Sequence, residues 1–253
     1  DFVYEARRPQ IPAAVPVDVA IAPAANAPAA NVNVPKPANT NVPAANVNSP
    51  TPYALPPTPS ASIPAEYNLA VPWMTQAPFA NWTGSYEDGC EEASSLIVHY
   101  YYSKQLFETQ DEMKQELDKA FAWEDKAFGY NLDTTAEETA RTLREYFGYA
   151  TVEVTTDVTI ARIKKEIAAG RPVIVPAYGK ALLNPNFQNG GPEYHMLVVK
   201  GYTGDNFITN DPGTRRGADY VYPTTRLVDA VHDWNNGDVK NGRKVMIVVH
   251  PNR

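Results

Sequence analysis

The stretch "EYHMLVVKGYTGDNFITNDPGT" at residues 193–214 contains the clearest strand pattern in the chain and two polar residues that flank it. The run "HMLVVKGY" predicts a buried strand, "TGDN" a turn and "FITND" the returning strand of a hairpin. His195 opens the first strand and Asp211 ends the second, so the two can be neighbours across the ladder. An aspartate there can hold an imidazole by its second nitrogen, which predicts a His195–Asp211 pair.

The only cysteine, Cys90, lies at the start of a run with helical periodicity. Apolar residues recur at helical spacing after it, at Ala93, Leu96, Ile97, Tyr100 and Tyr101. A helix N-terminus supplies partial positive charge and free N–H groups that favour the thiolate form of a nucleophile. The alternative is a small buried side chain that only packs. We interpret Glu91 and Glu92 as first-turn residues that complement the helix end rather than as acid–base groups.

A nucleophilic thiol needs a base within reach, and the chain offers four histidines. His99 lies half a turn out of phase with Cys90 on the predicted helix, so we expect it to face away. His232 lies in a helix-like run and His250 near the end of the chain. His195, at the edge of a buried strand after a polar loop, is therefore the expected base.

Patterns in the rest of the chain predict helices first and strands afterwards. Thr135 and Glu138 form a capping box, and Gly170 is a helix stop. Helices are expected over about 90–102, 109–121, 135–147, 157–169 and 225–234, and strands over 150–156, 172–178 and 244–249 in addition to the hairpin. This order predicts an α+β domain with N-terminal helices packed on a mainly antiparallel sheet.

Composition divides the chain near residue 65. Residues 1–65 hold 14 of the 23 prolines and none of the 14 glycines, and they repeat "PAANVN" at 28–33 and 43–48. Such sequence favours extended polyproline II conformations and buries too little apolar surface to offset its ordering entropy. We therefore expect an extended or disordered linker over 1–65 and one folded domain over 66–253.

Charge and residue types exclude several classes of function. The net charge of −7 argues against nucleic-acid binding. A single cysteine excludes an internal disulfide, and no metal or nucleotide motif occurs, so we expect no metal and no cofactor. No apolar stretch approaches 20 residues, so no membrane span is expected. The Pro/Ala-rich linker favours a secreted or envelope-attached, extracytoplasmic protein, and we expect a monomer.

Three blocks of the sequence occur in an order that is known from one family. "VPWMTQ" (71–76), "DGCEEAS" (88–94) and residues 193–214 resemble the glutamine, cysteine, histidine and aspartate blocks of the C39-like cysteine peptidases. The resemblance covers about residues 69–249 and implies a papain-like fold. It also implies Cys90 as nucleophile, His195 as general base and then acid, Asp211 as the group that orients it, and Gln76 as oxyanion donor, whose side-chain amide suits that role.

The expected function is therefore a cysteine peptidase that cleaves a peptide or protein substrate. Two alternatives remain open at this point. The domain could bind peptides without cutting them, or it could be another papain-fold amide hydrolase or transferase that acts on cell-wall peptides.

Overall fold

The computed structural model describes residues 9–16 and 63–251, which belong to one compact unit. The helices and strands are β1 (Glu66–Asn68), α3 (Cys90–Ser103), α4 (Gln110–Ala127), α5 (Ala136–Glu145), β2 (Thr151–Thr155), α6 (Ile160–Ala168), β3 (Val173–Tyr178), β4 (Tyr194–Thr203), β5 (Asn206–Asn210), β6 (Tyr220–Pro223), α7 (Thr224–Ala230) and β7 (Met246–His250). Short 3-10 turns lie at Pro78–Ala80, Gly84–Tyr86, Gly179–Leu182, Gln188–Gly190 and Val239–Asn241. The prediction of an α+β domain with helices first is confirmed.

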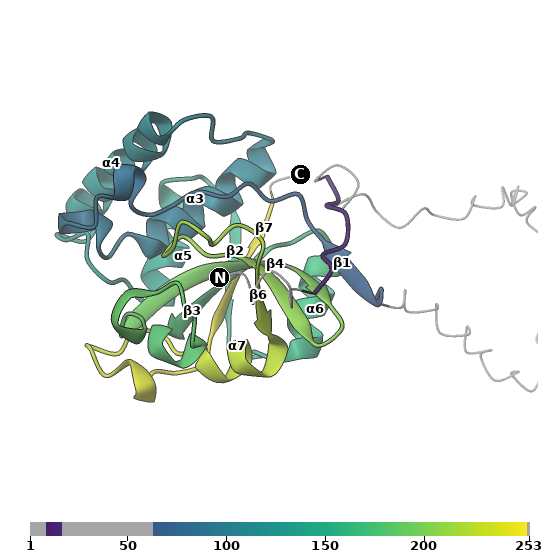
Figure 1. Ribbon diagram of the computed structural model, residues 1–253. Helices are drawn as coiled ribbons and strands as arrows, with labels where there is room; N and C mark the ends of the chain where they lie inside the picture. The colour runs from purple at the N-terminus through teal and green to yellow at the C-terminus, as the bar shows by residue number, and fades with distance from the viewer. Residues whose placement is uncertain (1–8, 17–62, 252–253) are drawn as a thin grey trace, which may run out of the picture. The chain divides into compact units, whose positions relative to one another are not determined.

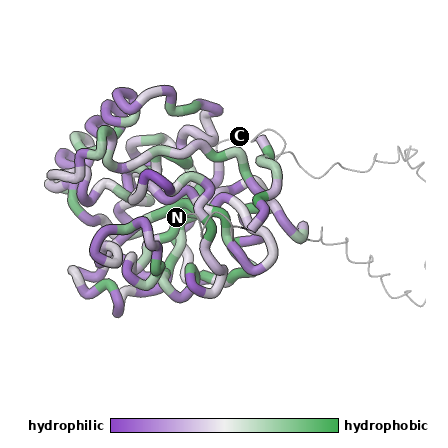
Figure 2. The backbone as a smooth tube through the Cα atoms, in the orientation of Figure 1, coloured by the Kyte–Doolittle hydropathy of each residue, from purple (hydrophilic) through white to green (hydrophobic). Residues whose placement is uncertain are grey.

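One antiparallel sheet of seven strands forms the centre of the domain, in the order β2-β7-β3-β4-β5-β6, with β1 paired to β4. Helices α3, α4 and α5 gather on one side of the sheet and α6 and α7 on the other (Figure 1). Nine of the ten residues of β4 are buried, as expected for a strand covered on both faces. Figure 2 shows the hydrophobic residues concentrated in these central strands.

Local capping signals set the helix boundaries that the sequence predicts well. Thr135 and Glu138 form the expected capping box at the start of α5. The side chain of Thr109 accepts from Glu112 N at the start of α4, which begins within a residue of its expected position. Gly170 has a φ of +80° directly after α6, a conformation that glycine adopts without strain. These helix ends depend on residues that are close together in the sequence, so the sequence alone predicts them.

The hairpin of β4 and β5 forms as predicted, with Val198 opposite Asn210. Its register shifts between Val199 and Gly201, where β1 crosses on the other side of β4. A Cβ on Gly201 would lie 2.7 Å from the carbonyl oxygen of Tyr67. The glycine in the "KGY" part of the hairpin therefore allows a third strand to approach closely.

Strand β1 was not expected and α4 is longer than expected, and two further differences, in β6 and α7, are decided by tertiary contacts. The strand β6 was not expected and pairs with β5 over four residues. Helix α7 was expected to reach residue 234 but ends at Ala230. Val231 is extended and bridges to Ala177 of β3, and His232 N donates to Pro176 O at 3.2 Å. Backbone pairing with the sheet replaces the last turn of the expected helix.

Residues 9–16 lie against the domain, although they belong to the predicted linker of residues 1–65. Val15 forms a parallel bridge with Leu69, and Ala70 N donates to Val15 O at 2.8 Å. The side chain of Asn68 donates to Pro12 O at 2.9 Å. The predicted linker thus contains a segment that pairs with the domain, while its residues 17–62 lie outside the described part of the chain. Within the described part, no helix is both long and apolar enough to cross a membrane.

Helices α3 and α4 contact each other through two buried carboxyl groups. Glu92 and Glu124 are each 1% exposed, and their side chains form a hydrogen bond with each other. Thr142 Oγ1 also donates to Glu124 Oε1 at 2.8 Å. Burial, followed by the charge of Glu124, raises the pKa of Glu92 well above its ordinary value, and burial raises that of Glu124. The pair therefore holds a proton to higher pH than exposed carboxyl groups do.

This pair should make the protein less stable as the pH rises. A carboxyl whose folded pKa exceeds its unfolded value of about 4.3 favours folding fully below that value and loses the contribution as pH rises to the folded pKa. We expect Glu92→Gln to increase the free energy of unfolding more at about pH 8 than at about pH 5, because the amide needs no proton. Urea unfolding at both pH values measures this difference. Glu137→Gln, an exposed first-turn control on α5, should show no such pH dependence; an equal effect of both variants would contradict the shared proton.

Candidate active site

Cys90 is the first residue of α3, and its side chain is 3% exposed. Its Sγ atom accepts from the backbone N–H of Met196 on β4 at 3.1 Å. The loop before it approaches α4 closely, since a Cβ on Gly89 would lie 2.9 Å from the ring of Phe121. The packing of α3 on β4 therefore carries the thiol to the residue that follows His195.

His195 and Asp211 lie together, as the hairpin predicted. His195 Nε2 and Asp211 Oδ1 are 2.8 Å apart, and the two residues are 2% and 0% exposed. The ring of Phe187 packs edge-on against the imidazole, with centroids 5.3 Å apart. A Cβ on Gly213 would lie 2.6 Å from His195 Cε1, so the backbone of Gly213 also packs closely against the imidazole ring. The imidazole is held on several sides, and its Nδ1 is the nitrogen not taken by Asp211.

Besides His195, Asp211 has donors from two other segments and from its own turn. Tyr222 OH donates to Oδ2 at 2.7 Å, and Asn184 Nδ2 donates to the same oxygen at 3.5 Å. The backbone N–H of Gly213 donates to Oδ1 at 3.0 Å. Burial alone would raise the pKa of Asp211, but the charge and hydrogen bond of His195 and the donors Tyr222 and Gly213 hold it below its ordinary value. The carboxylate is therefore ionised and fixed.

Tyr222 and Asn184 are residues of this site that the sequence did not indicate. Tyr222 comes from β6, which was not expected, and Asn184 from the loop between β3 and β4. Asn184 Nδ2 also donates to Tyr222 OH at 2.8 Å, so the two support each other. Neither carries a local motif, and only the fold brings them to Asp211.

Gln76 lies between the Asp211 turn and the Cys90 loop. Its backbone N–H donates to Pro212 O at 3.0 Å, and its side-chain Nε2 donates to Tyr86 O at 3.2 Å and Glu87 O at 2.9 Å. The residue is 3% exposed, and its Oε1 has no partner among the described residues. Both amide hydrogens thus hold the loop that leads to the cysteine.

Glu91 turns its side chain onto the cysteine, a contact that goes beyond the helix-end role inferred from sequence. Cys90 Sγ lies 3.0 Å from Glu91 Oε2, and Thr134 N donates to Glu91 Oε1 at 2.7 Å. Burial, followed by the charge of Glu91, raises the pKa of the Cys90 thiol well above its ordinary value. No hydrogen bond joins Cys90 to the His195 ring within the described residues. Adjacency to Cys90 was the only sequence signal for this contact.

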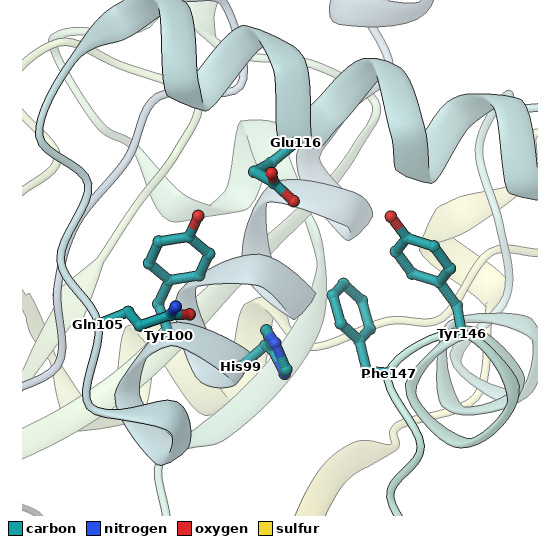
Figure 3. Close-up of a pocket in the computed structure, with 6 residues that line it drawn as sticks. All are labelled: His99, Tyr100, Gln105, Glu116, Tyr146 and Phe147. Carbon is teal, nitrogen blue, oxygen red and sulfur yellow. The ribbon is translucent and has the colours of Figure 1, made fainter.

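The other three histidines lie outside this site. His99 lines a separate depression of about 360 Å³ with Tyr100, Gln105, Glu116, Tyr146 and Phe147. Figure 3 shows the Glu116 carboxylate above His99 and Phe147, between the rings of Tyr100 and Tyr146. That carboxylate is already paired with Lys119 at 2.6 Å. His232 Nδ1 faces Gly242 O at 3.0 Å, and His250 lies 3.5 Å from Glu153.

A cysteine at a helix start, packed beside a His–Asp pair on an antiparallel hairpin, defines a papain-like, peptidase-type domain. The sequence profile described as "Peptidase_C39 like family" matches residues 68–237, and the chain belongs to this family. A solved structure from Bacillus anthracis, assigned provisionally as a C39-like peptidase, is similar at 18% identity and a TM-score of 0.48, over 73% of this chain and 96% of that one. No curated protein matches the chain.

The donor from Tyr222 should stabilise the ionised Asp211. A group whose folded pKa is lowered stabilises the fold above its unfolded pKa and loses this contribution as pH falls through the folded value. We expect Tyr222→Phe to cost about 1–3 kcal/mol at neutral pH, because a buried carboxylate loses a donor, and less in acid as Asp211 becomes protonated. Urea unfolding across the acid range measures this.

Tyr202→Phe is the matched control for that experiment. It removes a hydroxyl that donates to Pro64 O at 3.1 Å, also within the sheet but away from Asp211. Its cost should not depend on pH over the same range. If the cost of Tyr222→Phe were equally constant, the bond to Asp211 would not be the reason for the loss.

Proposed function

We propose that this domain is a cysteine peptidase with Cys90 as nucleophile, His195 as general base and acid, and Asp211 as the residue that orients the imidazole. The observation that carries the proposal is the contact between His195 Nε2 and Asp211 Oδ1, which lie 2.8 Å apart. Nδ1 then remains for the thiol, and Cys90 Sγ already touches the adjacent N–H of Met196 at 3.1 Å. The proposed reaction requires the sulfur to reach Nδ1, a contact that the structure does not contain among the described residues.

In the proposed reaction the thiol proton passes to His195 Nδ1, and the thiolate attacks the carbonyl carbon of the peptide bond. The Cys90 backbone N–H stabilises the oxyanion. Gln76 Nε2 is the second donor, and it must release Tyr86 O, the longer of its two bonds. The imidazolium then protonates the leaving amine. His195 next takes a proton from water, which attacks the acyl-enzyme and releases the acid and the thiol.

A second candidate function is peptide binding without cleavage. The raised pKa of the Cys90 thiol, due to burial and the charge of Glu91, favours this candidate because a thiol is a weak nucleophile. Action on cell-wall peptides is a substrate variant of the first proposal, since the attacked group is again an amide. The same assay separates these functions when it contains casein, short peptides and muropeptides.

We expect Cys90→Ala and His195→Ala each to lower the rate of cleavage by at least about 10³-fold, because nucleophile and base act as a unit. His250→Ala, which alters a surface ion pair with Glu153, should retain the rate. Product formation by mass spectrometry is the measurement. A substrate that binds to both cysteine and alanine forms, and is returned intact by the wild type, would support the binding module instead.

We also propose that the domain acts outside the cytoplasm, tethered to the envelope through its linker, as a monomer. The Pro/Ala-rich composition of residues 1–65 supports this placement. Fractionation of the producing cells tests it: the protein should appear in the secreted or envelope fraction, and a cytoplasmic pool alone would refute the proposal.

A further inference from the structure

The sulfur of Cys90 lies between a buried carboxyl and a backbone donor. Glu91 Oε2 is 3.0 Å away on one side and the N–H of Met196 is 3.1 Å away on the other. Met196 directly follows His195 on β4, so one strand carries both this donor and the imidazole. The carboxyl of Glu91 is 1% exposed and thus has little access to water. Its carboxyl oxygens contact the sulfur and the N–H of Thr134 in the loop before α5.

The orientation of Glu91 is fixed by parts of the same site. Its Oε1 accepts from Thr134 N at 2.7 Å, and Thr134 O accepts from the hydroxyl of Tyr194 at 2.9 Å. Tyr194 is the residue before His195 on β4. The strand that carries the proposed base therefore also positions the carboxyl against the nucleophile. A residue that only complements the helix end would need neither contact, since the helix dipole imposes no such orientation.

The same heavy-atom arrangement allows two proton positions. A neutral Glu91 donates its O–H to the sulfur, which then has two donors and is stabilised as thiolate. An ionised Glu91 instead accepts the S–H proton, and the sulfur remains a thiol. Two negative charges at 3.0 Å in a buried site are strongly disfavoured, so an ionised Glu91 shifts the formation of the thiolate to higher pH.

We propose that Glu91 shares a proton with Cys90 and that its protonation state decides whether the nucleophile is a thiolate or a thiol. The inference rests on the proposed role of Cys90 as nucleophile. With Glu91 neutral, the thiol proton resides on His195 and the thiolate is held by the Glu91 O–H and the Met196 N–H. When this state loses one proton to solvent, the remaining proton lies on sulfur, the imidazole is neutral and the carboxylate accepts from the thiol.

The surroundings favour the neutral carboxyl of Glu91. Burial, followed by the charge of Asp133, raises the pKa of Glu91 well above its ordinary value. Burial, followed by the charge of Asp88, raises the pKa of Asp133 itself to about 7. The titratable groups that face Glu91 or its partners are Asp88, Cys90 and Glu92 on its own segment, Asp133 before α5, Tyr194 and His195 on β4, and Asp233, which pairs with Arg243.

This device gives the thiol an unusual pH profile. An ordinary cysteine becomes steadily more reactive with pH as its thiolate fraction grows. Here the reactivity of Cys90 should fall as pH rises through the ionisation of Glu91, and rise again only when the thiol itself ionises. The active form of the site is thus its more acidic form.

Alkylation by iodoacetamide across about pH 4 to 10, a range that brackets carboxyl and thiol ionisation, tests the proposal on the full chain. Because Cys90 is the only cysteine, all label reports on it. Wild type should show the intermediate fall. Glu91→Gln should lack it and react about tenfold or more faster than wild type above the fall, since one pKa unit changes the thiolate fraction tenfold. The amide keeps both bonds, to sulfur and to Thr134 N, at every pH.

Glu92→Gln is the matched control, because it neutralises the next carboxyl on α3, which bonds Glu124 and not the sulfur. Its profile should retain the fall. Identical profiles for wild type and Glu91→Gln would overturn the proposal. Should Glu91→Gln fail to fold, ¹³C NMR of wild type labelled at the Cys90 Cβ decides: a thiolate signal that weakens and then returns with rising pH supports the proposal, and one monotonic titration overturns it.

These readouts need no substrate, so they are independent of peptidase activity. An intermediate fall in reactivity together with uncut peptides would retain the Glu91 inference and refute the proposed peptidase. Cleavage with an ordinary thiol profile would do the reverse.

Discussion

A carboxylate without exposed surface is stable only where several donors converge on it, and Asp211 imposes this requirement on the whole domain. Its donors come from β4, β6, the loop after β3 and its own turn. Two hydrogen bonds attach this turn to the segment before Cys90. Trp73 Nε1 donates to Asp211 O at 3.0 Å, and Gln76 N donates to Pro212 O. The sheet, its edge strand and the approach to Cys90 must all be in place before this charge is satisfied.

Strand β4, which supplies the imidazole, also determines the surroundings of the Cys90 thiol. Through Met196 it gives Cys90 a donor, and through Tyr194 it holds the loop whose Thr134 N–H orients Glu91. A cysteine nucleophile usually gains from positive surroundings. Here burial and the nearby carboxyl groups disfavour ionisation of the Cys90 thiol. The helix N-terminus and the Met196 N–H on β4 must therefore stabilise the thiolate enough to offset both effects. In the proposed mechanism a neutral Glu91 carboxyl favours the reactive thiolate, which links the protonation of Glu91 on α3 to the proposed chemistry of Cys90.

Sequence reasoning succeeded where the information is local. The β4–β5 hairpin, the helix that starts at Cys90 and the capping box of Thr135 follow from residues a few positions apart. It failed where long-range pairing decides. Strand β6, the early end of α7 at Ala230, and the pairing of Val15 with Leu69 each depend on backbone partners far away in sequence.

For the site, the sequence by itself predicted the order Gln76, Cys90, His195 and Asp211 and the pairing of the last two, because the two strands of a hairpin bring their open ends together. The β4–β5 ladder itself ends at Val198 and Asn210. Only the tertiary structure decided what each side chain contacts. It directs both amide hydrogens of Gln76 to the Cys90 loop, adds Tyr222 and Asn184 to Asp211, and sets Glu91 against the sulfur. The physical reason is that a buried polar atom needs a hydrogen-bond partner, and that partner can come from any part of the chain. Its position is therefore not marked by any periodic pattern in the sequence.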